Sequence, residues 1–294
     1  MRMQVHHYDA FSDVPHMGNP AGVMLESDKL STEEMQEIAR AIGFNETAFT
    51  MKSDVADIRL RYFTPGHEMN LCGHGTMAAI HALNDQGFLT GKDKIRVETK
   101  AGILDVKLEQ LASRHLNITM QQAAPKFEAF TGSVSRLAQV IGLVEQDIET
   151  NWPIMYGSTG TWTLLIPIKT LAAFSRMKPA TSQFPDVLEQ MPRVSIHPFC
   201  METIDPKATM HARHFSSPYS GTVEDAVTGT ASGVMGAYYA ANVVANPQEE
   251  LHIVIEQGFE VGRDGRVGVH VQKDAVEISG TAVYVADIGV SIQR

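Results

Sequence analysis

The pattern of apolar and polar positions predicts one clearly amphipathic helix at residues 31–43. Its apolar residues recur at the i, i+3, i+4 and i+7 positions of one helical face, namely Met35, Ile38, Ala39 and Ile42. Ser31 and Glu34 form the signature of a capping box at its start, and Gly43 is suited to end it. We therefore expect this helix to bury one face and expose the other.

Two further helices are predicted to be apolar on every side, at residues 71–83 and 226–245. The only ionisable side chains in the first are those of Cys72, His74 and His81, and the second has none. A helix without a polar face must be enclosed by protein. Each of these two helices is therefore expected to lie inside its own half of the chain.

Both enclosed helices open on similar stretches, Cys72-Gly73-His74-Gly75-Thr76 and Thr228-Gly229-Thr230-Ala231-Ser232. The first turn of a helix leaves backbone N–H groups without intrahelical partners, and these groups favour a bound anion. We predict that the two helix starts face one cleft and hold an anion there.

The surroundings of the two helix starts also match, which indicates an internal duplication. Phe63-Thr64-Pro65 precedes the first, and Phe215-Ser216-Ser217-Pro218 precedes the second. After the helices, the sequence of residues 97–102 resembles that of 254–258, and before them residues 35–43 resemble 135–142. Alternating or continuous apolar runs also predict strands at 4–11, 58–62, 104–108, 116–120, 164–166, 267–271, 276–279 and 282–288. We expect an α+β fold of two similar halves, 1–115 with 281–294 and 116–280, each a sheet around one buried helix.

Composition and charge narrow the class of protein. The chain has 294 residues, enough for two domains, and its 44% hydrophobic and 20% charged residues are typical of a globular protein. A net charge of −10 argues against nucleic acid and anionic membranes as partners. The N-terminal residues lack the apolar core of a signal peptide, and Cys72 and Cys200 are the only cysteines. We expect a cytoplasmic protein without a disulfide framework.

The side chains able to do chemistry gather near the two helix starts. They are Glu46, His74, Glu224, Asp225 and the hydroxyl of Thr230. No nucleotide-binding glycine loop occurs, neither cysteine has a neighbour at metal-ligand spacing, and residues 211–214 are interpreted as polar side chains of a strand rather than a metal site. Two plainer interpretations stay open, because Glu46 can be a solvated loop residue and Asp225 a helix N-terminal acid.

Three stretches, in the correct order, resemble the signatures of the PhzF-like phenazine-biosynthesis family. They are Asn45-Glu46-Thr47-Ala48-Phe49, Phe63-Thr64-Pro65 with Cys72-Gly73-His74-Gly75-Thr76, and Glu224-Asp225-Ala226-Val227-Thr228-Gly229-Thr230-Ala231. Gly18-Asn19-Pro20-Ala21-Gly22-Val23 is also similar, and the resemblance covers about residues 4–288. It implies a diaminopimelate epimerase-like fold, in which two pseudo-symmetric halves of barrel-like sheet surround central helices and the active site lies between them.

The resemblance also implies a cofactor-independent isomerase that moves a proton within a small, possibly cyclic, carboxylic acid. Glu46 matches the general acid and base, and His74 and Asp225 match the catalytic groups that flank it. The substrate-binding positions are Asn19, Asn45, Gly73, Gly75, Gly229 and Thr230, with Gly73 and Gly229 as backbone donors to the substrate carboxylate. No metal is implied, and a homodimer is expected.

Other functions remain open on the same residues. Epimerisation by two thiols would use Cys72, but its counterpart in the repeat is Thr228, which cannot act as a thiolate. A hydro-lyase, or a protein that binds small acids without catalysis, would share the same cleft. The sequence leaves the substrate, the pathway and the role of Cys72 undetermined, while Cys200 is interpreted as a buried apolar residue.

Overall fold

The computed structural model describes residues 2–111, 116–244, 250–273 and 275–292. The chain divides into two compact units: unit 1 comprises Met1–Gln121 and Ser279–Arg294, and unit 2 comprises Gln122–Ile278. The predicted second half began at residue 116. In the structure residues 116–121 form a strand that pairs with the strand before it, so they belong to unit 1.

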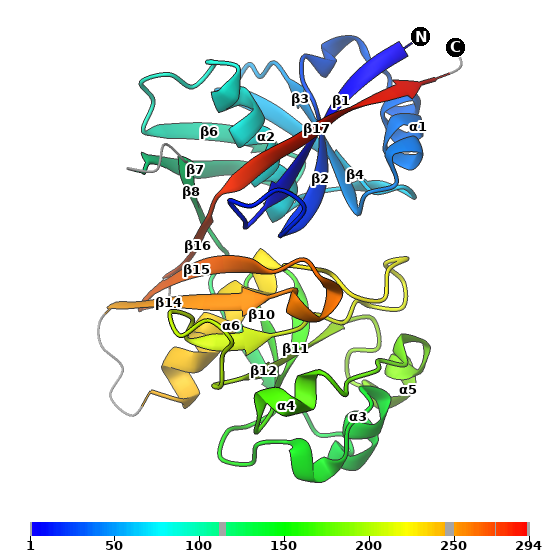
Figure 1. The fold of residues 1–294 in the computed structure, drawn as a ribbon, viewed down its shortest axis with the longest axis vertical. Helices are drawn as coiled ribbons and strands as arrows, with labels where there is room; N and C mark the ends of the chain where they lie inside the picture. The colour runs from blue at the N-terminus through cyan, green and yellow to red at the C-terminus, as the bar shows by residue number, and fades with distance from the viewer. Residues whose placement is uncertain (1, 112–115, 245–249, 274, 293–294) are drawn as a thin grey trace. The chain divides into compact units, whose positions relative to one another are not determined.

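The sheet of unit 1 contains strands from both ends of the chain, as Figure 1 shows. Its strands follow one another in the order β17 (Ala282–Ser291), β1 (Arg2–Ala10), β2 (Asn19–Met24), β3 (Glu46–Met51), β4 (Ile58–Phe63), β6 (Lys94–Thr99), β7 (Gly102–Gln110) and β8 (Leu116–Gln121). The pairs β2–β3 and β4–β6 are parallel and the others antiparallel. The short β5 (Glu68–Met69) pairs with β4.

Two helices cover opposite sides of these strands (Figure 1). The helix α2 (Gly73–Asp85) packs against β1, β2, β3 and β17, and every residue from His74 to Leu83 is buried, as its uncharged sequence predicted. The helix α1 (Thr32–Ile42) buries Met35, Ile38 and Ala39 against the other side. Its capping box and its left-handed Gly43, with φ of 74°, confirm the predicted start and end.

The sheet of unit 2 repeats this plan. Its order is β9 (Lys126–Ala129), β10 (Met155–Ser158), β11 (Trp162–Pro167), β12 (Ser195–Cys200), β13 (Met210–Ala212), β14 (Glu250–Gln257) and β15 (Gly265–Gln272), and β16 (Ala275–Gly280) follows along the chain. The pairs β11–β12 and β13–β14 are parallel and the others antiparallel, which is the alternation found in unit 1. The predicted α+β fold of two alike halves is confirmed.

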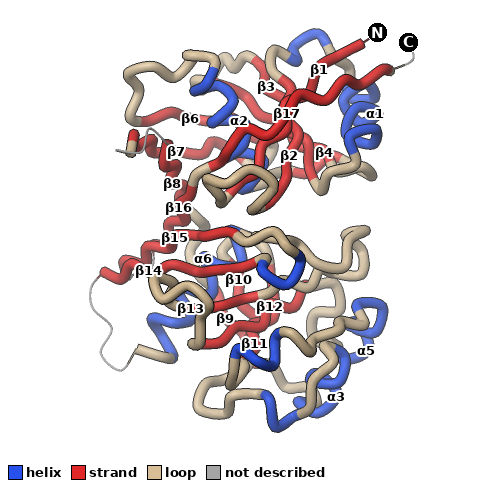
Figure 2. The backbone as a smooth tube through the Cα atoms, in the orientation of Figure 1, coloured by secondary structure: helices blue, strands red, loops and turns tan. Residues whose placement is uncertain are grey.

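Helices also occupy both sides of the unit 2 sheet. The enclosed helix α6 (Gly229–Asn242) packs against β10, β14 and β15 so closely that a Cβ on Gly236 would lie 2.5 Å from Cγ1 of Val269. The short helices α3 (Val134–Val140), α4 (Leu171–Phe174) and α5 (Phe184–Val187) form a separate core with β10, β11 and β12. Figure 2 shows α3 and α5 beside one another in unit 2. Single 3₁₀ turns lie at Ser27–Lys29, Glu145–Asp147, Thr181–Gln183 and Phe259–Val261.

One predicted correspondence between the halves is wrong. Residues 35–42 lie in α1, which connects β2 to β3, and Gly43 caps it. Residues 135–140 lie in α3, which connects β9 to β10. The positions equivalent to α1 are held by α4 and α5, between β11 and β12. Similar apolar spacing arose because both segments are amphipathic. None of the helices within the described residues has the length and apolarity needed to cross a membrane.

Candidate active site

The two parallel strands β2 and β3 bring predicted site residues to one edge of the unit 1 sheet. Ala21 lies opposite Glu46 in their register, so β2 begins with Asn19 at the same edge where β3 begins with Glu46. Asn19 is fully buried, and the Glu46 side chain is 16% exposed. Glu46 is thus a largely enclosed carboxylate rather than a solvated loop residue.

The start of α2 is held by a compact set of hydrogen bonds. Cys72 is the N-cap, and its Sγ accepts a hydrogen bond from the N–H of Gly75 at 3.2 Å. Thr76 Oγ1 donates to the carbonyl of Cys72 at 2.7 Å and contacts the hydroxyl of Tyr62 at 2.6 Å. Gly75 has no room for a side chain, because a Cβ there would lie 3.1 Å from Sγ of Cys72.

This fixed helix start places His74 between two other functional groups. Its Nε2 lies 3.1 Å from Oε2 of Glu46, and its Nδ1 lies 3.5 Å from Sγ of Cys72. The His74 side chain is 10% exposed. The predicted neighbours Glu46 and His74 are therefore brought together, in a thiol–imidazole–carboxylate chain that includes Cys72.

Burial and charge act in opposite directions on the pKa values of His74 and Cys72. Burial lowers the pKa of His74, but Cys72 and Glu46 raise it by more, through charge and hydrogen bonds, to well above the usual range. Burial raises the pKa of the Cys72 thiol against the opposing effect of His74. These directions favour a protonated imidazole at His74 beside the Glu46 side chain.

The same three side chains offer donor atoms that all lie within 4.8 Å of one another, which is compatible with a metal ion. In the structure each ring nitrogen of His74 already faces another member of the chain. The three donors therefore contact one another within the site.

A second group of predicted residues lies in unit 2 at the start of α6. Asp225 Oδ2 accepts a hydrogen bond from the Thr228 hydroxyl at 2.6 Å. Gln257 fixes both residues, since its Nε2 donates to the carbonyl of Asp225 at 2.9 Å and its Oε1 accepts from the N–H of Thr228 at 3.2 Å. Gly229 is buried, and Thr230 is partly buried with its carbonyl bound to Thr159.

His214 lies beside Asp225, and His197 lies beside His214, although neither was among the predicted site residues. The N–H of Asp225 donates to the carbonyl of His214, and Nδ1 of His214 lies 3.1 Å from Nδ1 of His197. Burial lowers the pKa of His214 to about 4, although the Asp225 charge acts in the opposite direction. His214 is thus an uncharged neighbour of Asp225. The only sequence feature that drew attention to His214 was its place in the polar run at residues 211–214.

The remaining polar candidates have structural partners. Glu224 forms a two-pronged ion pair with Arg213, at 2.8 and 2.6 Å, so it is not available as a proton shuttle. His211 is fully buried, with Nδ1 2.7 Å from Glu256 and Nε2 2.9 Å from Glu260. The polar run of β13 is therefore a paired, buried network.

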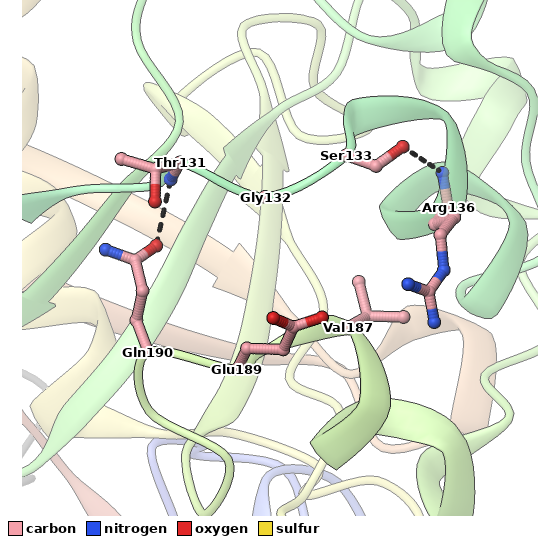
Figure 3. A pocket seen from close by; sticks show the side chains of 7 residues that line it. All are labelled: Thr131, Gly132, Ser133, Arg136, Val187, Glu189 and Gln190. Atoms are coloured by element: carbon pink, nitrogen blue, oxygen red, sulfur yellow. Dashed lines mark hydrogen bonds between the residues drawn. The ribbon is translucent and has the colours of Figure 1, made fainter.

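A separate hollow in unit 2 contains none of the predicted residues. Figure 3 shows its lining, which consists of Thr131, Gly132, Ser133, Arg136, Val187, Glu189 and Gln190. Two of its polar contacts are internal, since Gln190 Oε1 accepts from the N–H of Thr131 and Ser133 Oγ accepts from the N–H of Arg136. We assign no chemistry to it.

Comparison with known proteins finds similar sequences over nearly the whole chain. The family model described as "Phenazine biosynthesis-like protein", PhzC-PhzF, matches residues 8–288. The chain is 49% identical to the "Uncharacterized isomerase YfhB" of Bacillus subtilis over 281 residues, 94% of each protein. It is 31% identical to the trans-2,3-dihydro-3-hydroxyanthranilate isomerase of Pseudomonas aeruginosa over 289 residues, 95% of this chain and 96% of that protein.

Solved structures agree as well. A phenazine biosynthesis protein of the PhzF family from Bacillus anthracis has a TM-score of 0.97 and 52% identity, with coverage of 99% of this chain and 100% of that one. A hydroxyproline epimerase from Agrobacterium vitis has a TM-score of 0.61 at 11% identity, with coverage of 98% and 92%. The second likeness concerns the fold alone, and it agrees with the expected diaminopimelate epimerase-like architecture.

Proposed function

Because this chain belongs to the phenazine biosynthesis-like family, PhzC-PhzF, and is an isomerase, we propose that it moves a proton within a small carboxylic acid, with Glu46 as general acid and base. The observation that carries the proposal is the 3.1 Å contact between Glu46 Oε2 and His74 Nε2 in a largely buried place. An enclosed carboxylate beside a fixed cation can take up a substrate proton and return it.

In the proposed reaction Glu46 removes a proton from one carbon of the substrate and returns it to another carbon of the same conjugated system. One C–H bond breaks and one forms, so neither an oxidant nor a cofactor is required. The charge of His74 stabilises the carboxylate in the resting enzyme and, once Glu46 is protonated, the negative charge that develops on the substrate. Because the N–H of Gly75 is bound to Cys72, we propose Gly73 as the backbone donor in unit 1.

The proposed substrates are small unsaturated or cyclic carboxylic acids. A relative named for trans-2,3-dihydro-3-hydroxyanthranilate supports this class and supplies the first compound to test. We assign supporting roles to Asn19 and Asn45 in unit 1 and to Asp225, Gly229 and Thr230 in unit 2. These assignments stay predictions, as do the homodimer and the cytoplasmic location.

The proposal is tested by incubating the protein with a panel of such acids in D₂O and following deuterium incorporation by mass spectrometry and NMR. An isomerase gives a product of unchanged composition in which the double bond or the carbonyl has moved. Inversion at a single carbon would indicate an epimerase, and loss of water a hydro-lyase. Tight binding without exchange of any substrate hydrogen would indicate a binding protein and contradict the proposal.

A further inference from the structure

Two histidines that have no part in the proposed reaction face one another on adjacent strands of unit 2. His252 on β14 lies directly opposite His270 on β15 in the antiparallel register. Their rings are stacked, with centroids 4.1 Å apart and an angle of 3° between the planes. Residues directly opposite one another in a strand pair project to the same face of the sheet, so both imidazoles are available to one ligand.

A carboxylate lies beside the same edge of both rings. Glu250 precedes His252 by two residues in β14 and therefore points to the same face of the sheet. Its Oε1 lies 3.3 Å from Nε2 of His252 and 2.7 Å from Nε2 of His270. The two imidazole nitrogens and the carboxylate oxygen thus lie close together at the surface. Because the stacked rings have parallel planes, one ring must turn out of the stack before both nitrogens can bind one ion.

The His270 nitrogen beside Glu250, Nε2, is shielded from solvent. It makes no hydrogen bond with any described residue, although Oε1 of Glu250 lies 2.7 Å from it. The other ring nitrogen, Nδ1, lies 3.4 Å from Oε2 of Glu277 on β16. A carboxylate on Nδ1 favours the tautomer whose Nε2 carries a free lone pair, and metal-binding histidines commonly have such a partner.

The geometry points to a binding site for a divalent transition-metal ion, formed by Glu250, His252 and His270 and positioned by Glu277. The donor atoms of the three ligands lie within 4.8 Å of one another, and two imidazoles with one carboxylate form a donor set that suits Zn²⁺. An ion there would join β14 to β15. The site is independent of the proposed reaction.

Zn²⁺ itself is the probe for the test, which uses the full, metal-free chain in calorimetric titration and thermal unfolding. The Cys72→Ser background weakens the other metal-compatible cluster, so that one site is expected to remain. In that background, His252→Ala and His270→Ala should each weaken Zn²⁺ binding by about tenfold or more. Both changes should also abolish the rise in Tm on Zn²⁺ addition.

Matched variants make the result specific. His67→Ala removes an exposed histidine far from the cluster along the chain and should leave Zn²⁺ affinity unchanged. Glu277→Gln should weaken binding less than loss of either histidine. Equal Zn²⁺ affinity in the Cys72→Ser background and in both histidine variants of that background would overturn the assignment.

Discussion

Nε2 of His74 lies 3.1 Å from Oε2 of Glu46, although the first residue belongs to helix α2 and the second to strand β3. The contact depends on two local features of the fold. The capped start of α2 fixes the histidine, and the parallel pairing of β2 with β3 fixes the glutamate at the edge of the sheet. A carboxylate held beside a cation in this way is suited to proton transfer.

Replacement of His74 by Gln should lower kcat by about 100-fold or more, because Glu46 loses the charge that stabilises its carboxylate. The rate is measured on the acid identified by deuterium exchange. His67→Gln, which changes an exposed histidine, is the matched control and should keep the parent rate. A His74→Gln rate within a few-fold of the parent would remove His74 from the reaction.

Replacement of Cys72 by Ser should leave most of the activity, because serine also accepts the N-cap hydrogen bond from Gly75. Cys72→Ala removes this acceptor and should lower the free energy of unfolding by about 1 kcal/mol. Urea denaturation and kcat are measured for both variants. Loss of activity by orders of magnitude in a folded Cys72→Ser variant would instead favour thiol-based epimerisation.

The His211 network should make the stability of unit 2 depend on pH. Burial lowers the pKa of His211, but hydrogen bonds and charge from Glu256 and Glu260 raise it above the usual value. The contribution of protonated His211 to the free energy of unfolding is therefore complete below about pH 6.5. It is lost as pH rises through the raised pKa of the folded state. The Tm difference between the parent and His211→Gln should therefore shrink from pH 6 to pH 9.

Near pH 6, His211→Gln should lower the free energy of unfolding by about 3 kcal/mol, because the change leaves two carboxylates of a largely buried cluster without their partner. The pKa of Glu256 is lowered, since hydrogen bonds from His211, Ile204 and Asp205 outweigh the effect of its burial. The contribution of ionised Glu256 to the free energy of unfolding is present above the usual glutamate pKa. It is lost as pH falls through the lowered pKa of the folded state. A Tm difference that grows from pH 6 to pH 9 would contradict this account.

Replacement of Gly236 by Val should lower the free energy of unfolding by about 2 kcal/mol or more, because a Cβ there already lies 2.5 Å from Cγ1 of Val269. Denaturant titration measures the change. Gly66→Val is the control, since Gly66 is exposed and the nearest atom to its added Cβ is 3.8 Å away. Equal stability of the two variants would contradict the tight packing of α6 on β15.

Features that depend on neighbouring residues in the chain were predictable from the sequence. The capping box of α1 and its end at Gly43 follow from local hydrogen bonding, and the enclosure of α2 and α6 follows from their lack of charge. The burial of Cys200 in β12 also agrees with prediction. Short motifs around Glu46 and His74 carried enough information to indicate the family.

Features that depend on distant partners were not predictable. The ion pair of Glu224 with Arg213 and the burial of His211 between Glu256 and Glu260 need a register that no local pattern specifies. The equivalence assigned to residues 135–142 failed for a related reason, because amphipathic spacing does not reveal which strands a helix connects. The place of His214 beside Asp225 was not predictable either, because no pattern of residue spacing indicates this contact.

The most direct test of the central claim compares Glu46→Gln with the parent protein in D₂O, using the acid that exchanges most rapidly. The account predicts that deuterium incorporation and isomerisation fall together by at least about 100-fold while the Kd for that acid and the Tm stay nearly unchanged. Glu33→Gln, a change of an exposed glutamate in α1, should behave like the parent. Retention of most of the exchange rate by Glu46→Gln would contradict the account.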